Sequence, residues 1–128
     1  MEPFRYHVFV YDPRESEGGG QTLAALRREI SARGLEDEVQ VTTCGSLGLG
    51  DDAPNLLVYP EGIWYSKVLP SDVPGLVEQH FQQGRPVEGL ARMDPAELRA
   101  EMLANREKRQ AAERAREAAG AMPDEEME

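Results

Sequence analysis

A short turn of Pro60, Glu61 and Gly62 lies between two apolar segments, residues 55–59 and residues 63–68. Gly62 has no Cβ and adopts positive φ at little cost, which suits the end of a tight turn. Short segments rich in branched aliphatic and aromatic residues are typical of strands. The sequence therefore predicts an antiparallel β-hairpin. Its second strand carries two neighbouring aromatic residues, Trp64 and Tyr65.

Two further strands are predicted before the hairpin. Residues 5–11 are apolar on both faces of an extended chain, which is typical of a central strand. Residues 39–42 alternate between valine and a polar residue, which indicates a second strand. A loop from Cys44 to Pro54 then leads to the hairpin.

Two helices complete the pattern. Thr22 is the expected N-cap of a helix that runs through Arg33, and Ser71 is the expected N-cap of a helix that ends near Gln83. The predicted order is β-α-β-β-β-α, with a right-handed crossover between the first two strands. This order is the arrangement of a thioredoxin-like α/β sandwich.

The rest of the chain, residues 92–128, is predicted to be a charged helical extension of a domain formed by residues 1–91. Asp94 is a suitable N-cap, and residues 96–119 are rich in Ala, Glu and Arg. The apolar residues expected to dock its first turns are Leu98, Met102 and Leu103. The distal part lacks the large apolar residues of a coiled coil, so both a frayed polar helix and a partner-binding helix remain open. Residues 123–128 are expected to be an acidic, disordered end.

Charge and cysteine content restrict the classes of partner and compartment. With 14 basic and 24 acidic residues the net charge is 14 − 24 = −10, which repels phosphate backbones and anionic lipids, so no nucleic-acid or membrane partner is expected. No apolar stretch approaches the ~18 residues of a membrane span, and the N-terminus lacks the pattern of a secretory signal. A lone cysteine rules out an internal disulfide, as in a reducing compartment, so we expect a cytoplasmic protein.

Three stretches of the sequence resemble one known family. They are HVFVY at residues 7–11, TTCGSLGLGDDAPNLLVYPEGIWYSK at residues 42–67 and VEQHFQQGRPVE at residues 77–88. Over about residues 5–90 the chain resembles the thioredoxin-like [2Fe-2S] ferredoxins, also called Shethna-type ferredoxins. The resemblance implies a thioredoxin-like fold, a [2Fe-2S] cluster, electron transfer and a homodimer.

The resemblance also places the four thiolate ligands of the family's cluster. The first falls on Tyr11, the second near residues 18–20, the third on Ser46 and the fourth on Gly50. Residues 46–50 keep the spacing and the Leu-Gly pair of the family's C-L-G-x-C motif, but no ligand position holds a cysteine. The lone thiol, Cys44, lies two residues before the third position. Because a [2Fe-2S] cluster needs four protein ligands, we expect no cofactor and no metal in this chain.

Three functions follow as hypotheses. The first is a non-enzymatic accessory or regulatory protein that binds a partner protein, in particular a redox enzyme. The residues expected to contact that partner are Cys44, Leu47, Leu49, Trp64 and Tyr65, although packing of one of the two aromatics into the core is equally expected. The second hypothesis is electron transfer with a [2Fe-2S] cluster. The third is thiol chemistry at Cys44, which lacks a C-x-x-C motif and has no histidine at a spacing that specifies a base.

Overall fold

The computed structural model describes residues 3–126 and contains a four-stranded sheet with the strand order β2-β1-β3-β4. The strands are β1 (Tyr6–Tyr11), β2 (Val39–Thr43), β3 (Asn55–Tyr59) and β4 (Ile63–Tyr65). β1 pairs in parallel with β2, and β3 pairs antiparallel with both β1 and β4. The predicted hairpin and the central position of β1 are therefore confirmed. The fold is the predicted thioredoxin-like α/β arrangement followed by a long C-terminal helix.

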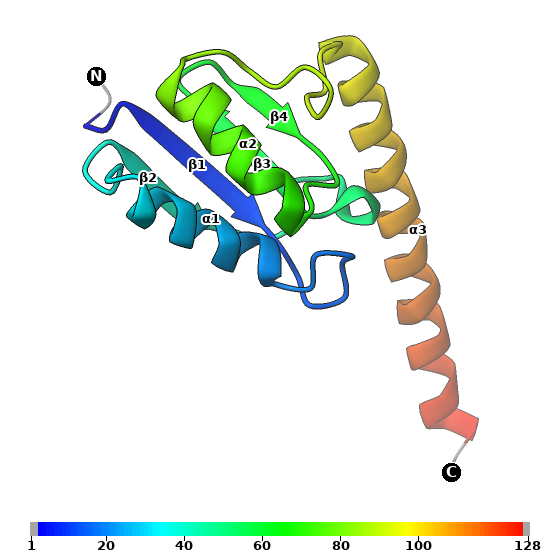
Figure 1. Cartoon of the computed structure of the whole chain (residues 1–128). Helices are drawn as coiled ribbons and strands as arrows, with labels where there is room; N and C mark the ends of the chain where they lie inside the picture. The colour runs from blue at the N-terminus through cyan, green and yellow to red at the C-terminus, as the bar shows by residue number, and fades with distance from the viewer. Residues whose placement is uncertain (1–2, 127–128) are drawn as a thin grey trace.

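Two helical segments cover one face of the sheet (Figure 1). The first is α1 (Gln21–Ala32), which connects the parallel strands β1 and β2. The second is continuous from 3-10 helix η2 (Pro70–Asp72) through α2 (Val73–Leu76) to π-helix η3 (Val77–Gln82). Side chains of the sheet and of both helical segments form the core between these layers; they include Val8, Val10, Leu26, Leu56, Val58, Tyr65, Leu76 and Phe81.

Both predicted N-caps are wrong. The carboxylate of Asp12 caps α1, because its two oxygens accept the N–H groups of Gly20 (3.0 Å) and Leu23 (2.9 Å). Thr22 lies inside the helix, fully buried, and its hydroxyl donates to the carbonyl of Val68 at 2.7 Å. At the second helical segment the carboxylate of Asp72 accepts the N–H of Leu69 at 3.0 Å. The side chain that directly follows β1 thus supplies the anion that the N-terminus of α1 favours.

Strand β4 is shorter than predicted. It ends at Tyr65, and Lys67 takes a left-handed conformation with φ of 52°. The chain then bonds elsewhere, because Ser66 N–H donates to the carbonyl of Leu90 and Lys67 N–H to that of Asp52. The last residues of the predicted strand therefore do not pair with β3, and their N–H groups bond to neighbouring loops instead.

The C-terminal helix α3 spans Pro95–Glu126. Asp94 caps it as predicted, accepting the N–H groups of the two residues after Pro95. The helix continues through Pro123 instead of ending at residue 119, and residues 127–128 of the predicted disordered end lie outside the described residues. Leu98 is buried, but Leu103 is 38% exposed, so its predicted docking is wrong. Within residues 3–126 no helix has the length and hydropathy of a membrane span.

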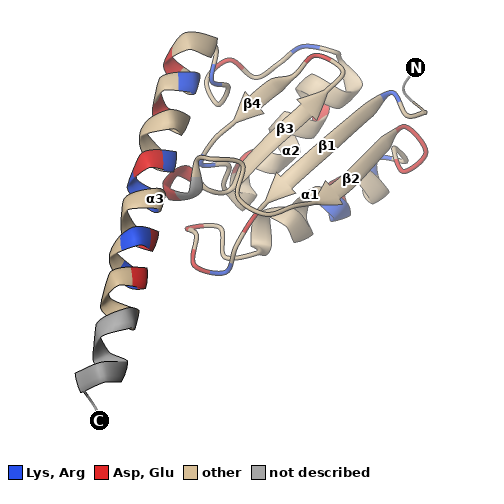
Figure 2. Ribbon diagram, turned by 180° about the vertical axis from the view of Figure 1, so that it is seen from behind, with Lys and Arg blue, Asp and Glu red and all other residues tan. Residues whose placement is uncertain are grey.

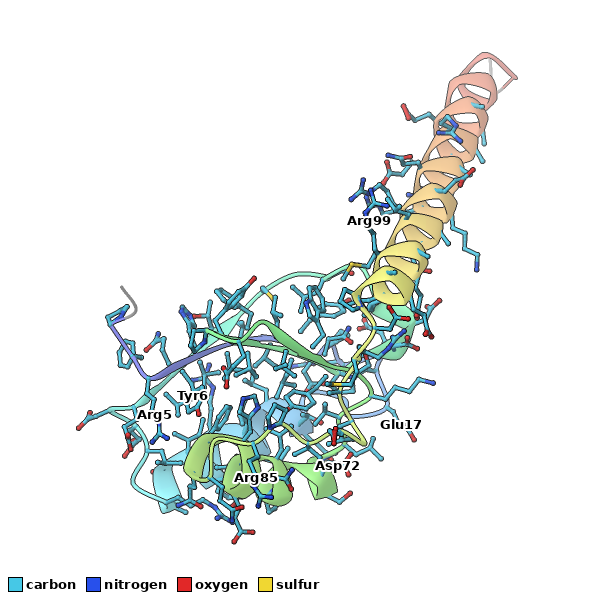
Figure 3. All side chains as sticks on the ribbon, turned by 90° about the horizontal axis from the view of Figure 1, so that it is seen from above. Arg5, Tyr6, Glu17, Asp72, Arg85 and Arg99 are labelled. Carbon is cyan, nitrogen blue, oxygen red and sulfur yellow. The ribbon has the colours of Figure 1, made fainter. Side chains whose placement is uncertain are left out.

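The other face of the sheet carries no helix among the described residues (Figure 2). The register places His7, Phe9, Leu57, Tyr59 and Trp64 on this open face, and of these five Leu57 is buried by its neighbours. Viewed from above, α3 leaves the domain on this side of the sheet, away from α1 and α2 (Figure 3). The open face and α3 therefore lie on the same side of the domain.

Candidate functional site

The loop between β2 and β3 is anchored at both ends. At its start the N–H of Cys44 donates to the carbonyl of Val10 at 3.0 Å. At its end the buried amide of Asn55 donates to the carbonyl of Leu49 at 2.9 Å, and Leu49 itself is fully buried. Between them the 3-10 helix η1 (Gly50–Asp52) turns the chain toward β3. The loop is therefore a packed element of the domain.

The positions that the resemblance assigns to cluster ligands come together at one end of the sheet. Tyr11 is the last residue of β1, and it lines a cavity of about 340 Å³ together with Pro13, residues 15–17 and Asp51. Ser46 lines a second cavity, and Asp51 lies in the walls of both, so the two cavities are neighbours. The phenol and hydroxyl oxygens here are hard donors, whereas iron-sulfur clusters are held by soft thiolates.

The second ligand position, residues 18–20, favours glycine over any residue with a side chain. A Cβ at Gly18 would lie 2.6 Å from both Pro54 Cγ and Thr22 Oγ1, closer than real Cβ contacts. Gly19 and Gly20 have φ values of 56° and 86°, in the region that favours glycine. A cysteine is therefore disfavoured at each of these three positions, by close contact at the first and by backbone conformation at the other two.

The donor set does not fit a [2Fe-2S] cluster. The chain has one thiol, and none of the four ligand positions carries it. Among the described residues there is also no group of three or more His, Cys, Asp or Glu side chains placed to hold a metal ion. Four protein ligands are required for such a cluster, and the residues at this end of the sheet do not supply them.

Helix α3 packs directly on the loop. The amide of Asn105 donates to the carbonyl of Gly48 at 2.8 Å. Gly48 has φ of 95°, and a Cβ there would lie 3.2 Å from the side chain of Met102. The lack of a side chain at Gly48 allows this close approach of the helix. The loop between β2 and β3 is thus partly covered by α3, a contact that the sequence did not predict.

A charge cluster fixes the start of α3 to the same region. Arg92 is hydrogen bonded to Glu101 and lies 3.5 Å from Asp52, and Lys67 lies 3.8 Å from Asp52. Burial, followed by the hydrogen bond with Glu101, raises the pKa of Asp52. The hydrogen bond with Arg92, followed by that with Asp52, lowers the pKa of Glu101. The guanidinium of Arg92 therefore joins two carboxylates, one from the loop and one from α3.

A groove of about 440 Å³ separates the loop from the next turns of α3; we call it the loop–helix groove. Its loop wall consists of Ser46, Leu47, Gly48 and Asp51. Its helix wall consists of Met102, Asn105, Arg106, Lys108 and Arg109. The groove therefore combines one carboxylate with three basic side chains.

Cys44 is half-buried, and burial raises the pKa of its thiol. Its sulfur lies 3.7 Å from the carbonyl oxygen of Val10, the geometry of a protonated thiol that donates. The histidines bond elsewhere, since His7 contacts Thr42 (2.7 Å) and His80 contacts Tyr65 (2.7 Å). A nucleophilic cysteine needs a lowered pKa or an adjacent base, and this environment favours neither.

The expected partner contacts divide into buried and accessible residues. Tyr65 and Leu49 are fully buried, so their prediction as contact residues is wrong. Leu47 and Trp64 are half-buried, and Trp64 lies on the open face. The alternation of strand side chains between the two faces explains why only one of the neighbouring aromatics is accessible.

Tyr65 instead belongs to a buried polar network. The N–H of Val87 donates to the Tyr65 hydroxyl at 3.0 Å, and that hydroxyl contacts His80 Nδ1 at 2.7 Å. His80 Nε2 contacts the Glu61 carboxylate at 3.0 Å. Every member is satisfied if the tyrosine donates to Nδ1 and Nε2–H donates to Glu61. This network connects the hairpin turn to the π-helical segment, and the sequence pattern alone did not indicate it.

The fold and these loop positions define a thioredoxin-like protein of the ferredoxin class. The chain is 35% identical over 96 residues to a 2Fe-2S ferredoxin of Clostridium pasteurianum, covering 67% of this chain and 94% of that protein. It is 42% identical over 96 residues to a 2Fe-2S ferredoxin of Aquifex aeolicus, covering 66% of this chain and 86% of that protein. No protein-family model matches the chain.

A solved structure agrees with these relatives. The crystal structure of the wild-type thioredoxin-like [2Fe-2S] ferredoxin from Aquifex aeolicus superimposes with a TM-score of 0.62 at 30% identity, covering 71% of this chain and 99% of that chain. The chain therefore belongs to the thioredoxin-like [2Fe-2S] ferredoxin family. Its single cysteine is consistent with loss of the cluster ligands.

Proposed function

We propose that this chain is a cofactor-less member of the ferredoxin family, not an enzyme, that acts by binding a partner protein. The observation that carries the proposal is the set of residues at the four positions where the family has cluster ligands. The thiols are absent, the second ligand position is shaped for glycine, and α3 packs on the loop through Asn105 and Gly48. Electron transfer requires a cluster near the surface, so both the donor set and this packing argue against it.

The open face of the sheet is the proposed contact surface. His7 stacks on Phe9 with a centroid distance of 4.4 Å, and Phe9 meets Tyr59 edge to face at 5.9 Å. Trp64 lies on the same face, and the strands carry no charged residue (Figure 2). Aromatic residues without charge are typical of the centre of a protein interface. A redox enzyme is the first candidate partner, because the relatives are 2Fe-2S ferredoxins, which are electron carriers.

The test is capture of partners from the native host, followed by measurement of affinity with purified components. Tyr59→Glu places a charge on an exposed residue of the open face, whereas Gln21→Glu places the same charge on α1. We expect the first variant to weaken binding at least tenfold and the second to leave it unchanged, with both melting like the parent. Equal affinity of both variants would refute the open face as the contact surface.

Self-association is the competing use of this face. The resemblance implies a homodimer, and a second copy that bound through the open face would cover the same aromatic residues. Sedimentation of the parent chain and of Tyr59→Glu distinguishes the two cases. We expect one partner molecule to bind each copy of the chain, whether or not the free chain forms a dimer. A dimer that buries Tyr59 in its interface and binds no partner would contradict the proposal.

A further inference from the structure

From the charges on its walls, we infer that the loop–helix groove binds a small phosphate-bearing ligand. Three basic side chains, Arg106, Lys108 and Arg109, line the groove together with one carboxylate, Asp51, so the charge of its walls is 3 − 1 = +2, or +1 when Glu113, the partner of Arg109, is counted as well. The chain as a whole carries −10. Basic side chains gathered at one cavity of an acidic protein attract anions to that cavity.

The basic residues of the groove are available to a ligand. Among residues 3–120 neither Arg106 nor Lys108 forms an ion pair. Arg109 has a partner, Glu113 at 3.7 Å, but both side chains are more than half exposed, and such pairs contribute little. Arginine presents several donors in a plane and binds phosphate oxygens in pairs.

Neutral donors complete the groove. The hydroxyl of Ser46 accepts the N–H of Gly48 at 3.2 Å, so its own proton remains free to donate into the groove. The amide nitrogen of Asn105 donates one proton to Gly48 and has a second one to offer. Hydroxyl and amide donors beside arginines are the groups that bind phosphate oxygens in other proteins.

Size and net charge select the class of ligand. A cavity of about 440 Å³ falls in the range of small-molecule sites. A long anionic polymer would extend beyond the groove into the field of a chain with a charge of −10. A small phosphate compound stays within the Debye length of ~8 Å at physiological salt, where the groove's own charges dominate. The N-terminus of α1 is not a competing site, because the carboxylate of Asp12 already occupies it.

The test is isothermal titration calorimetry of the full chain with inorganic pyrophosphate and, separately, with adenosine diphosphate. Each titration is measured at low salt and at physiological salt. The variant Arg106→Gln/Arg109→Gln removes two charges from the groove. The matched control Arg114→Gln/Arg116→Gln removes two charges from the same helix outside it. Glutamine keeps helix propensity, and circular dichroism verifies that both variants keep α3.

We expect the groove variant to weaken binding of the probes by about tenfold or more, and the control by less than about twofold. Tighter binding of the diphosphate nucleotide than of pyrophosphate would assign a nucleotide as the ligand, and equal binding would assign a simpler phosphate compound. No binding of either probe at millimolar concentration, or equal loss in both variants, would overturn the inference. These results do not depend on whether a protein partner binds the open face.

Discussion

Replacing Tyr65 with phenylalanine removes one hydroxyl from the buried network and leaves the ring in place. That hydroxyl accepts the N–H of Val87 at 3.0 Å and contacts Nδ1 of His80 at 2.7 Å. Tyr65 and His80 are both fully buried, so no water replaces the lost group at the imidazole. The substitution therefore leaves one buried acceptor and one half-buried donor without a partner.

The cost follows from these two groups. An unsatisfied buried polar group costs about 1–3 kcal/mol, so we assign about 2 kcal/mol to His80 and about 1 kcal/mol to the more accessible N–H of Val87. The sum is about 3 kcal/mol, which corresponds to a lower melting temperature by roughly 10 °C or more for a chain of this size.

Thermal and urea denaturation of the parent and of Tyr65→Phe measure this loss. Tyr59→Phe is the matched control, because Tyr59 is 40% exposed and its hydroxyl has no hydrogen bond within the described residues. We expect the control to change the free energy of unfolding by less than about 0.5 kcal/mol. A cost below about 1 kcal/mol for Tyr65→Phe would refute the buried network.

Three further outcomes are expected. Burial raises the pKa of Tyr65 to about 12. The protonated hydroxyl therefore stabilises the fold fully below about pH 10, the ordinary tyrosine pKa, and this stabilisation is lost as the pH rises to about 12. Urea denaturation should show this alkaline loss in the parent and not in Tyr65→Phe. Burial raises the pKa of the Cys44 thiol, so its alkylation by iodoacetamide should have a rate midpoint at higher pH than that of a small model thiol; a lower midpoint would revive thiol chemistry. Asn105→Ala removes the hydrogen bond to Gly48, worth about 1 kcal/mol, and should speed amide hydrogen exchange in the first turns of α3 relative to Arg114→Ala; equal exchange in the two variants would show that α3 is not held there.

Local patterns in the sequence were sufficient for the central layers of the fold. The alternation along β1 and β2, the turn at Gly62 and the cap at Asp94 each depend on residues that are close in sequence. The third and fourth ligand positions, Ser46 and Gly50, are what the resemblance to the ferredoxin family implies, and the Leu-Gly pair in residues 46–50 carries that resemblance.

The contacts that local patterns missed join distant segments. Asp12 caps a helix that begins at Gln21, a role that Thr22 was better placed to fill by sequence. Asn105 reaches Gly48 across 57 positions of the chain. The sequence offered one indication of this contact, because Asn105 stands among charged residues on the helix face that docks. Its acceptor could not be predicted, because a backbone carbonyl has no sequence signature. The burial of Tyr65 in place of Trp64 also depended on strand register, which is a tertiary property.

Iron and acid-labile sulfide, measured in the chain purified without oxygen and again after reconstitution, test the loss of the cluster most directly. The 2Fe-2S ferredoxin of Clostridium pasteurianum, treated in parallel, is the positive control. We predict a colourless protein with only background iron and sulfide, because one thiol outside the four ligand positions cannot hold the cluster. Stoichiometric iron and sulfide, with visible charge-transfer absorption, would contradict the account.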